Sequence, residues 1–423
     1  NCNLKYGARL IHSVLGDNST ISCCEVLNNL IFPSHEQHHN NSFLISACIM
    51  GQSNMAAGAT IGSNHNSRAA DGEIVASRGF WPGLCSSVKH SSRFASFTML
   101  SKADYPNELN IKLPFSLVNN NTQHNELEVM PAYWWMYNMY AIARNTSKYQ
   151  SRDKRKRKIQ NIEFETFAPD TVEETIAARK LLEVWTAKAH LIKSKVDFSE
   201  YENKELRQIG QNLLINQPEY VDSLEICGEG MEKGKRKVRI LKPRKAYNAY
   251  GEMILYYAVK NIIHYLDENK ENSIEKLNNM FEGKRLREWI NLGGQMMPNE
   301  YVEQLRNDIN EGVLNTWDEI HHRYDELWQN YQQEKLRHSY LSLLYLLQAN
   351  EITPEAWEDT LDKAIEIQQY ICNQVYESRK KDYENPYRNA TFRNEEEKIA
   401  VIGTIDETSF VKQVKEETEP YCI

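Results

Sequence analysis

The sequence has little of the residues that mark specialised protein classes. Its 423 residues include only 8 Cys and no Cys-x-x-Cys pair, which excludes a disulfide-dense secreted domain and favours the reducing cytoplasm. With 18 Gly and 12 Pro, collagen-like and low-complexity classes are excluded as well. No apolar run approaches the ~18 residues that span a bilayer. The formal net charge of -8 argues against a general nucleic-acid binder. We therefore expect a soluble chain of two or three domains.

Charge divides the chain near Met130. Residues 1–130 carry only 17 of the charged residues and are rich in Asn, Ser and Gly. This composition is typical of short strands joined by frequent turns. The remaining residues hold the other 91 charges, which indicates amphipathic helices with solvated faces.

A single apolar residue recurs at every sixth position in the charge-poor part. One run is Leu15, Ile21 and Leu27, and the second is Phe43, Ile49, Met55 and Ile61. This spacing fits neither an amphipathic helix nor an alternating strand. It fits a parallel β-helix in which each short strand contributes one inward side chain, so all four residues of the second run should be buried. The two runs are out of phase, which predicts a loop inserted within residues 33–41.

The stretch 50–62, Met-Gly-Gln-Ser-Asn-Met-Ala-Ala-Gly-Ala-Thr-Ile-Gly, resembles hexapeptide-repeat proteins of the trimeric acyltransferase superfamily. Residues 113–118, followed by Pro131-Ala132, resemble the closing strand and exit of such domains, split by an insertion. Residues 62–68, 80–84 and 152–156 are similar to an uncharacterised bacterial family defined only as a domain of unknown function, whose members carry further β-helix upstream. The resemblance implies a left-handed parallel β-helix and a homotrimer.

The composition and the resemblance together predict four segments. Residues 1–132 form the β-helix, 133–168 an aromatic and basic connector, 169–393 a mostly α-helical domain and 394–423 an acidic, partly ordered tail. Capping signals and apolar periodicity predict helices over about 171–193 and 247–266, and from Thr353-Pro354 onward. Residues 300–348 should form two helices or one bent helix.

Histidines within residues 33–41 are the leading candidates for catalysis. In trimeric hexapeptide acyltransferases a single His commonly acts as general base, so the resemblance assigns this role to His38 or His39, close to His35. Imidazole suits the role because its pKa of ~6.5 leaves a neutral base at pH 7. The acyl donor would be acyl-coenzyme A or an acyl-carrier protein. Two alternatives stay open: a turn-capping role, and a zinc site like that of gamma-class carbonic anhydrases.

A second set of polar residues follows the best repeat. The spacing from His65 to His90 equals the spacing from Arg68 to Arg93. If the coils stack these pairs, they would bind a sugar or nucleotide-sugar phosphate together with Asn66, because Arg forms bidentate bonds to phosphate oxygens. The alternative is a polar ladder that hydrogen-bonds to itself.

These residues lead to three hypotheses for function. The first is acyl transfer to an amino or hydroxyl group of a sugar or nucleotide sugar, in which His38 or His39 faces a cleft shared with the second set. The second is a non-catalytic trimeric scaffold or binding module, and the third a gamma-type metal site. For a trimer, an exposed apolar patch at Phe80, Trp81 and Leu84 is expected to mark the contact.

Overall fold

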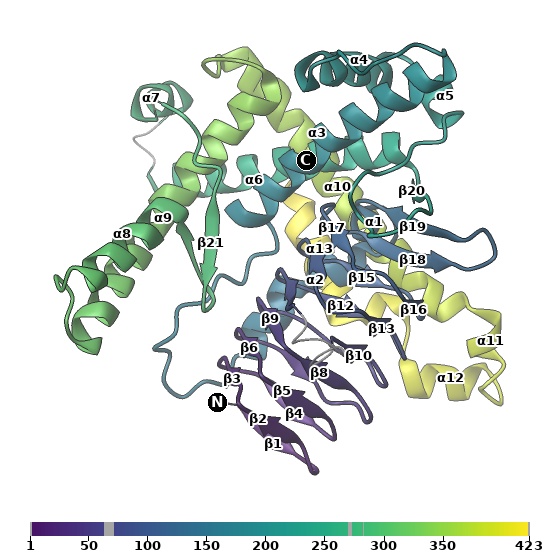
Figure 1. The fold of residues 1–423 in the computed structure, drawn as a ribbon, viewed down its shortest axis with the longest axis vertical. Coiled ribbons are helices and arrows are strands. Elements are labelled where there is room, and N and C mark those ends of the chain that lie inside the picture. The colour runs from purple at the N-terminus through teal and green to yellow at the C-terminus, as the bar shows by residue number, and fades with distance from the viewer. Residues whose placement is uncertain (1, 63–71, 270–272, 282, 422–423) are drawn as a thin grey trace.

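The amino-terminal part of the chain winds into a parallel β-solenoid of about six turns, and a mostly helical region follows (Figure 1). The computed structural model describes residues 2–62, 72–269, 273–281 and 283–421. The solenoid has three faces. Face 1 contains β1 (Asn3–Lys5), β4 (Thr20–Ser22), β7 (Glu36–Gln37), β12 (Trp81–Pro82), β15 (Met99–Leu100) and β18 (Leu117–Asn121). Asn54 joins β7 to β12, because it bridges to Glu36 and its N–H donates to the carbonyl of Phe80.

The other two faces each have six strands. Face 2 contains β2 (Arg9–Ile11), β5 (Glu25–Leu27), β8 (Phe43–Ile45), β10 (Thr60–Ile61), β13 (Ser87–Val88) and β16 (Asp104–Tyr105). Face 3 contains β3 (Val14–Leu15), β6 (Leu30–Ile31), β9 (Ala47–Ile49), β11 (Ile74–Ala76), β14 (Arg93–Phe94) and β17 (Asn110–Ile111). Face 1 continues beyond the solenoid through the antiparallel β19 (Glu126–Met130) and then β20 (Val238–Ile240), which comes from the helical region.

The strand pairing between neighbouring coils shows that the repeat length is not constant. Arg9 pairs with Glu25 and Glu25 pairs with Phe43, so successive coils differ in length. No loop interrupts residues 33–41, which form a corner, β7 and the next corner, so the predicted insertion there is wrong. The longest coil lies further on, between Thr60 and its partner Ser87. Each coil has three inward positions, and the number of residues per coil varies. The spacing between inward residues therefore departs from six.

Most inward side chains of the solenoid are apolar, although the coil that contains β7 has the polar Gln37 at an inward position. Ile49, Met55 and Ile61 are buried as predicted, but Phe43 is only half-buried, and Leu44 occupies the inward position instead. The inward residue of β8 therefore comes one position later than the six-residue pattern predicts. Because alternate residues of a strand face opposite sides, this shift turns Phe43 outward.

The corners of the solenoid explain why this part is rich in Asn, Ser and Gly. Most corners hold one residue in the left-handed backbone region, which Gly and Asn adopt at least cost. Non-glycine examples are Asn18, Asn28, Ser34, Asn41, Ser46 and Ser91, and glycine examples are Gly58, Gly62 and Gly79.

The helical region begins directly after β19. Its helices are α1 (Tyr133–Tyr137), α2 (Met139–Ser151), α3 (Pro169–Lys193), α4 (Asn203–Asn216), α5 (Pro218–Asp222), α6 (Pro243–Glu268), α7 (Ile274–Met280), α8 (Asn299–Asn310), α9 (Trp317–Leu347), α10 (Pro354–Glu384), α11 (Pro386–Asn389), α12 (Glu395–Ile402) and α13 (Ser409–Thr418). A hairpin of β21 (Trp289–Leu292) and β22 (Gln295–Pro298) precedes α8. The predicted helices are confirmed, and residues 300–348 form two. None of the helices in the described ranges is long and apolar enough to cross a membrane.

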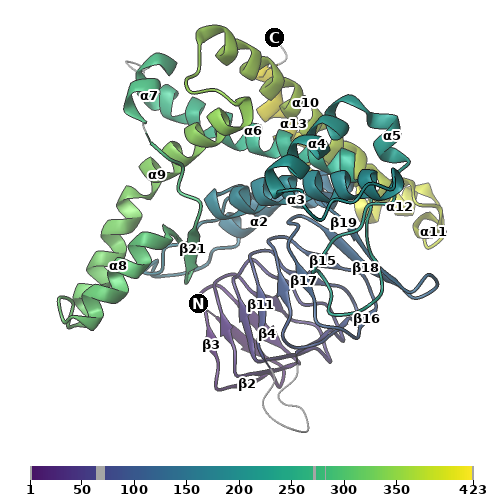
Figure 2. The ribbon, with the colours of Figure 1, turned by 45° about the horizontal axis from the view of Figure 1, so that its top comes forward.

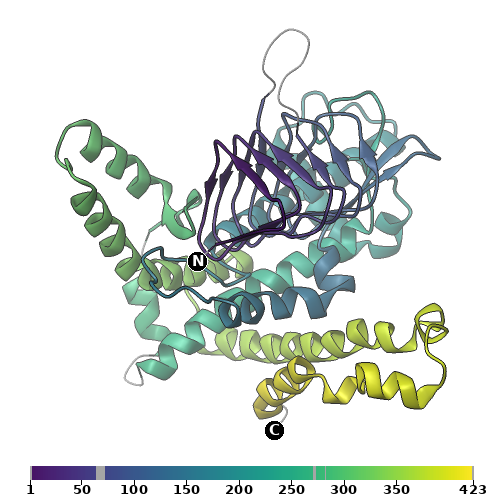
Figure 3. The ribbon, with the colours of Figure 1, turned by 90° about the horizontal axis from the view of Figure 1, so that it is seen from below.

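The helical region packs along one side of the solenoid (Figures 2 and 3). Trp134 of α1 packs on Trp81 of face 1 at 5.7 Å between ring centroids. Phe80 is buried and stacks on Phe94, so it belongs to the core. Of the predicted apolar patch only Leu84, 58% exposed, lies open, so the expectation of an exposed patch at these three residues is wrong. The helices of this same chain cover the face that was expected to meet a neighbour.

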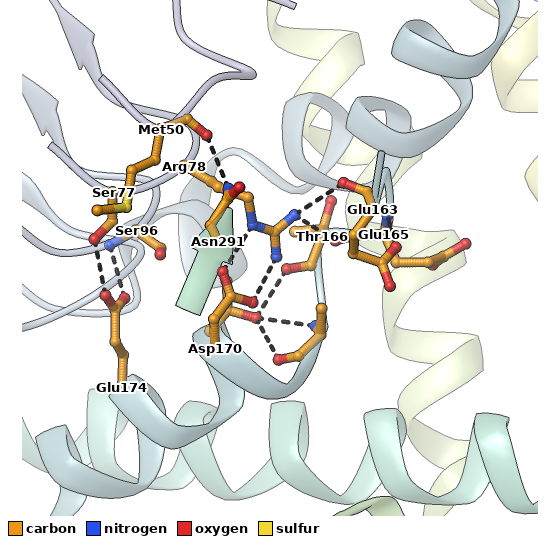
Figure 4. A network of polar contacts seen from close by, with 12 residues as sticks. Met50, Ser77, Arg78, Ser96, Glu163, Glu165, Thr166, Asp170, Glu174 and Asn291 are labelled. Atoms are coloured by element: carbon orange, nitrogen blue, oxygen red, sulfur yellow. Dashed lines mark hydrogen bonds and ion pairs between the residues drawn. The ribbon is translucent and has the colours of Figure 1, made fainter. Parts of the chain in front are cut away.

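A buried polar junction fixes α3 against the solenoid (Figure 4). Arg78, at a corner between faces 3 and 1, donates two hydrogen bonds of 2.8 Å to the Asp170 carboxylate and one of 2.9 Å to the Glu165 carbonyl. Glu174 accepts from the Ser96 N–H at 2.7 Å and from the Ser77 hydroxyl at 3.1 Å. Burial raises the pKa of Glu174 to about 7. The junction therefore joins the two parts of the chain through a buried guanidinium and two partly buried carboxylates.

The acidic tail is also built into the molecule. Phe410, Val411 and Val414 of α13 are buried in the main core, and Gln368 of α10 donates to the Thr418 hydroxyl at 2.8 Å. The tail expected to be partly ordered is thus helical over most of residues 395–421.

Candidate functional site

His35, one of the three neighbouring candidates, is part of the solenoid core. Its side chain is fully buried at a corner between faces 3 and 1. Nε2 lies 3.1 Å from the Gln37 side-chain oxygen and Nδ1 lies 2.8 Å from the Ser53 hydroxyl. Because the Gln37 oxygen can only accept, Nε2 carries the proton and Nδ1 accepts. Burial lowers the pKa of His35 to about 4, so this histidine is a neutral structural group.

His38 and His39 are exposed at the next corner, between faces 1 and 2. Their ring centroids are 4.4 Å apart. Near them, Glu36 pairs with Lys148 and Arg152 of the α2 end, each at 3.0 Å. Partial burial is the main cause that lowers the pKa of His38, and repulsion from His39 lowers it further. His38 is therefore a neutral, accessible imidazole at pH 7.

The second predicted set lies elsewhere. His90 is at a corner between faces 2 and 3, and Arg93 is exposed on face 3, where it pairs with Val75 of the neighbouring coil. His90 and Arg93 therefore lie on a different corner and face of the solenoid from His38 and His39. The other members of the set, His65, Asn66 and Arg68, lie outside the described residues, so their role stays a prediction.

The metal alternative finds no support within a single chain. In the part of the chain that the structure describes, no group of three or more His, Cys, Asp or Glu side chains could hold a metal ion. His35 in particular points inward and uses both ring nitrogens within the core.

A pocket lined by several cationic side chains, which we call the cationic pocket, lies in the helical region. It has a volume of about 660 Å³ and lies between α3, α4, the end of α9 and the segment 283–287. This volume is in the range of small-molecule sites. Five cationic side chains line it, and these are Arg179, Arg207, Lys284, Arg285 and Arg287.

Two of these cations are neutralised by carboxylates. Arg207 pairs with Glu183 at 2.7 Å, and Arg285 pairs with Glu173. Among the described residues, no carboxylate forms an ion pair with Arg179, Lys284 or Arg287, and no carboxylate besides Glu183 lines the pocket. The pocket therefore carries excess positive charge.

Aromatic rings contact three of the cations at and beside the pocket. The Arg179 guanidinium lies 4.1 Å from the Tyr247 ring centroid, and its Nε is buried without a hydrogen-bond acceptor in the described ranges. The Arg285 guanidinium and the Lys180 ammonium approach the Tyr345 ring at 4.7 and 5.4 Å. The rings thus hold these cations in place through their faces.

Lys180 shows that the cations are close enough to repel one another. Burial lowers the pKa of Lys180, and repulsion from Arg207, Arg287 and Arg285 lowers it further. The positive charge of Lys180 is therefore disfavoured by the arginines of the pocket.

Sequence reasoning missed this pocket because its residues come from separate segments. Arg179 and Arg207 lie on α3 and α4, whereas Lys284 and Arg287 follow α7. The one local signal is Lys284-Arg285-x-Arg287, a short basic cluster after Gly283. Such a cluster alone usually marks a solvated surface.

Comparisons with known proteins find similarity without an activity. Residues 2–185 match the domain of unknown function DUF4954, and residues 258–421 match the domain of unknown function DUF6819. The cationic pocket takes residues from both matched segments and from the stretch between them. An uncharacterized protein of Treponema pallidum (strain Nichols) is 44% identical over 404 residues, which are 96% of this chain and 54% of that relative. The chain thus spans about half the length of this relative.

Proposed function

We propose that the protein binds a phosphorylated small molecule, of the sugar-phosphate or nucleotide-sugar class, in the cationic pocket. The observation that carries this proposal is the group of Arg179, Lys284 and Arg287, which surround a cavity of about 660 Å³ without ion-pair partners in the described chain. Guanidinium groups bind phosphate oxygens through paired, charge-assisted hydrogen bonds. A bound dianion would replace the repulsion among these cations by attraction.

The effect on Lys180 supports the same ligand class. Its pKa is lowered first by burial and then by repulsion from three arginines that line the pocket. A phosphate group within the pocket would offset this repulsion and raise the pKa of Lys180. A neutral ligand would leave the repulsion in place, which is why we favour an anion.

Isothermal titration with inorganic pyrophosphate and with uridine diphosphate glucose tests the proposal. Lys284→Gln/Arg287→Gln should bind both at least ~100-fold more weakly than the unsubstituted protein, because two charge-assisted bonds are lost. Lys363→Gln, at an exposed lysine of α10, is the matched control and should bind like the unsubstituted protein. Equal affinity in the pocket variant, or no binding at millimolar ligand, would refute the proposal.

Acyl transfer at the corner of faces 1 and 2 is a second candidate, and the lowered pKa of His38 favours it. A neutral, accessible imidazole can remove a proton from an attacking amine or hydroxyl. With acyl-coenzyme A and a nucleotide sugar, His38→Asn or His39→Asn should lower turnover by ~10²–10⁴-fold. His12→Asn, at another exposed corner histidine, is the control and should keep full turnover. No acyl transfer by the unsubstituted protein would end this candidacy.

We also propose membership of the hexapeptide-repeat superfamily, with its left-handed coil and trimeric assembly. Three inward positions per coil, on three parallel faces, agree with three six-residue steps per turn. Because helices cover face 1, a trimer centred on the solenoid would have to use faces 2 and 3. Light scattering should give three times the chain mass, and a monomer at all micromolar concentrations would refute it.

A further inference from the structure

A helical arm projects from the body of the protein. It consists of residues 299–326, that is α8, the turn after it and the first part of α9, and it extends away from the other helices in all three views (Figures 1, 2 and 3). Val302 and Leu305 of α8 are buried, so the arm has a packed base. The tip, residues 308–319, is exposed over most of its length.

The tip combines exposed apolar side chains with negative charge. Ile309 is 42% exposed, Val313 61% and Trp317 76%. An exposed tryptophan is costly in water, and tryptophan is enriched at the centres of protein interfaces. The tip also has no Lys or Arg and carries four carboxylates, which are Asp308, Glu311, Asp318 and Glu319.

The cationic pocket has the complementary properties. Its cations Lys284 and Arg287 are exposed at the rim, where they can meet the carboxylates of the tip. Its wall includes Leu344 and Tyr345, and Ile215 is exposed beside them. The pocket volume of about 660 Å³ is large enough for an indole ring with a flanking residue.

We propose that the arm tip of one copy of this chain docks into the cationic pocket of a second copy, with Trp317 as the anchor. The arm extends away from the body, and its tip lies at the beginning of α9, whereas the pocket lies at the end of the same helix. The arm tip can therefore reach only the pocket of another copy. The contact is head-to-tail, so repeated copies form either a closed ring or an open chain. Phosphorylated ligand and arm tip compete for the same cations, so ligand binding dissociates the assembly; this competition rests on the proposed function.

Complementation between two variants tests the proposal. The tip variant is Trp317→Ala/Val313→Ser and keeps its pocket, whereas the pocket variant is Lys284→Glu/Arg287→Glu and keeps its tip. All four positions are exposed, so both variants should keep the fold, which far-ultraviolet circular dichroism verifies. Each variant alone lacks one half of the contact.

Light scattering at low salt, from low to high micromolar concentration, gives the readout. The unsubstituted protein should increase in mass with concentration, whereas each variant alone should keep one constant mass, that of the solenoid trimer or, where the chain does not trimerise, that of the monomer. The equal mixture of the two variants should be heavier than either variant alone. Inorganic pyrophosphate, but not sodium chloride of equal ionic strength, should return the unsubstituted protein to this constant mass. An unsubstituted protein of constant mass, variants that gain mass with concentration as it does, or a mixture no heavier than its components would each overturn the proposal.

Docking of the arm and binding of a phosphorylated ligand use the same pocket, but each can be tested without the other. Pyrophosphate binding by the tip variant tests the ligand site without the docked arm. Arg306→Gln, on the arm but away from the tip, is the control for the arm and should assemble like the unsubstituted protein.

Discussion

Three neighbouring histidines of the solenoid differ in their exposure to water. His35 is fully buried, whereas His38 and His39 are exposed at the next corner. The deciding contact is Ser53, which lies one coil further along the chain and donates to the His35 ring. That contact depends on the coil length, which the six-residue pattern predicts only approximately.

His35 and Glu174 should make the free energy of unfolding depend on pH in opposite directions. His35 has a folded pKa of about 4 against 6.5 for the free side chain, so the unfolded state binds the extra proton. Acidification across this window should therefore lower the free energy of unfolding, by up to about 3 kcal/mol. Glu174 has a folded pKa of about 7 against 4.5, so the folded state binds the proton, and acidification from pH 7 should raise the free energy of unfolding.

Urea denaturation at about pH 7 and about pH 5 separates the two groups. On acidification, His35→Gln should gain stability relative to the unsubstituted protein, and Glu174→Gln should lose stability relative to it. If all three proteins keep parallel stabilities over this range, neither buried group titrates as described.

At the scale of elements, helices were easier to predict than strand register. α10 begins at Thr353-Pro354 because the Thr353 hydroxyl accepts from the Ala356 N–H at 3.2 Å, and both signals are local. The register of β8 depends instead on its neighbours, since Phe43 pairs with Glu25 on one side and with Thr60 on the other. A one-residue change of register exchanges the inward and outward faces.

Replacement of two adjacent residues in β8 should therefore have unequal effects. Leu44 is fully buried, so Leu44→Ala should lower the free energy of unfolding by about 2–5 kcal/mol through lost burial and a cavity. Phe43 faces outward and is half-buried, so Phe43→Ala should cost clearly less. Chemical denaturation measures both, and a larger loss for Phe43→Ala would show that the register is wrong.

At the scale of the molecule, the two compositional halves are not independent units. The predicted boundary at residue 132 separates strands from helices, but β20 pairs with β19, and Arg78 of the solenoid is enclosed by α3 and the connector. Such contacts join residues far apart in the chain, for example Arg78 and Asp170. No local pattern predicts them, and the same is true of the cationic pocket.

Loss of the junction should destabilise the whole molecule. Arg78→Met would leave Asp170 without its bidentate partner in a nearly closed site, and should lower the free energy of unfolding by about 3 kcal/mol or more. Arg9→Met is the control, because its ion pair with Glu25 is at the surface and should contribute at most about 1 kcal/mol. Equal losses in the two variants would mean that the junction does not hold the parts together.

The most direct test of the phosphate-binding pocket is a crystal structure of the protein grown with uridine diphosphate glucose. We predict electron density for the diphosphate between Arg179, Lys284 and Arg287, with guanidinium nitrogens at hydrogen-bond distance from its oxygens. Density for the ligand at another site, or an unliganded pocket at saturating ligand, would contradict the proposed function.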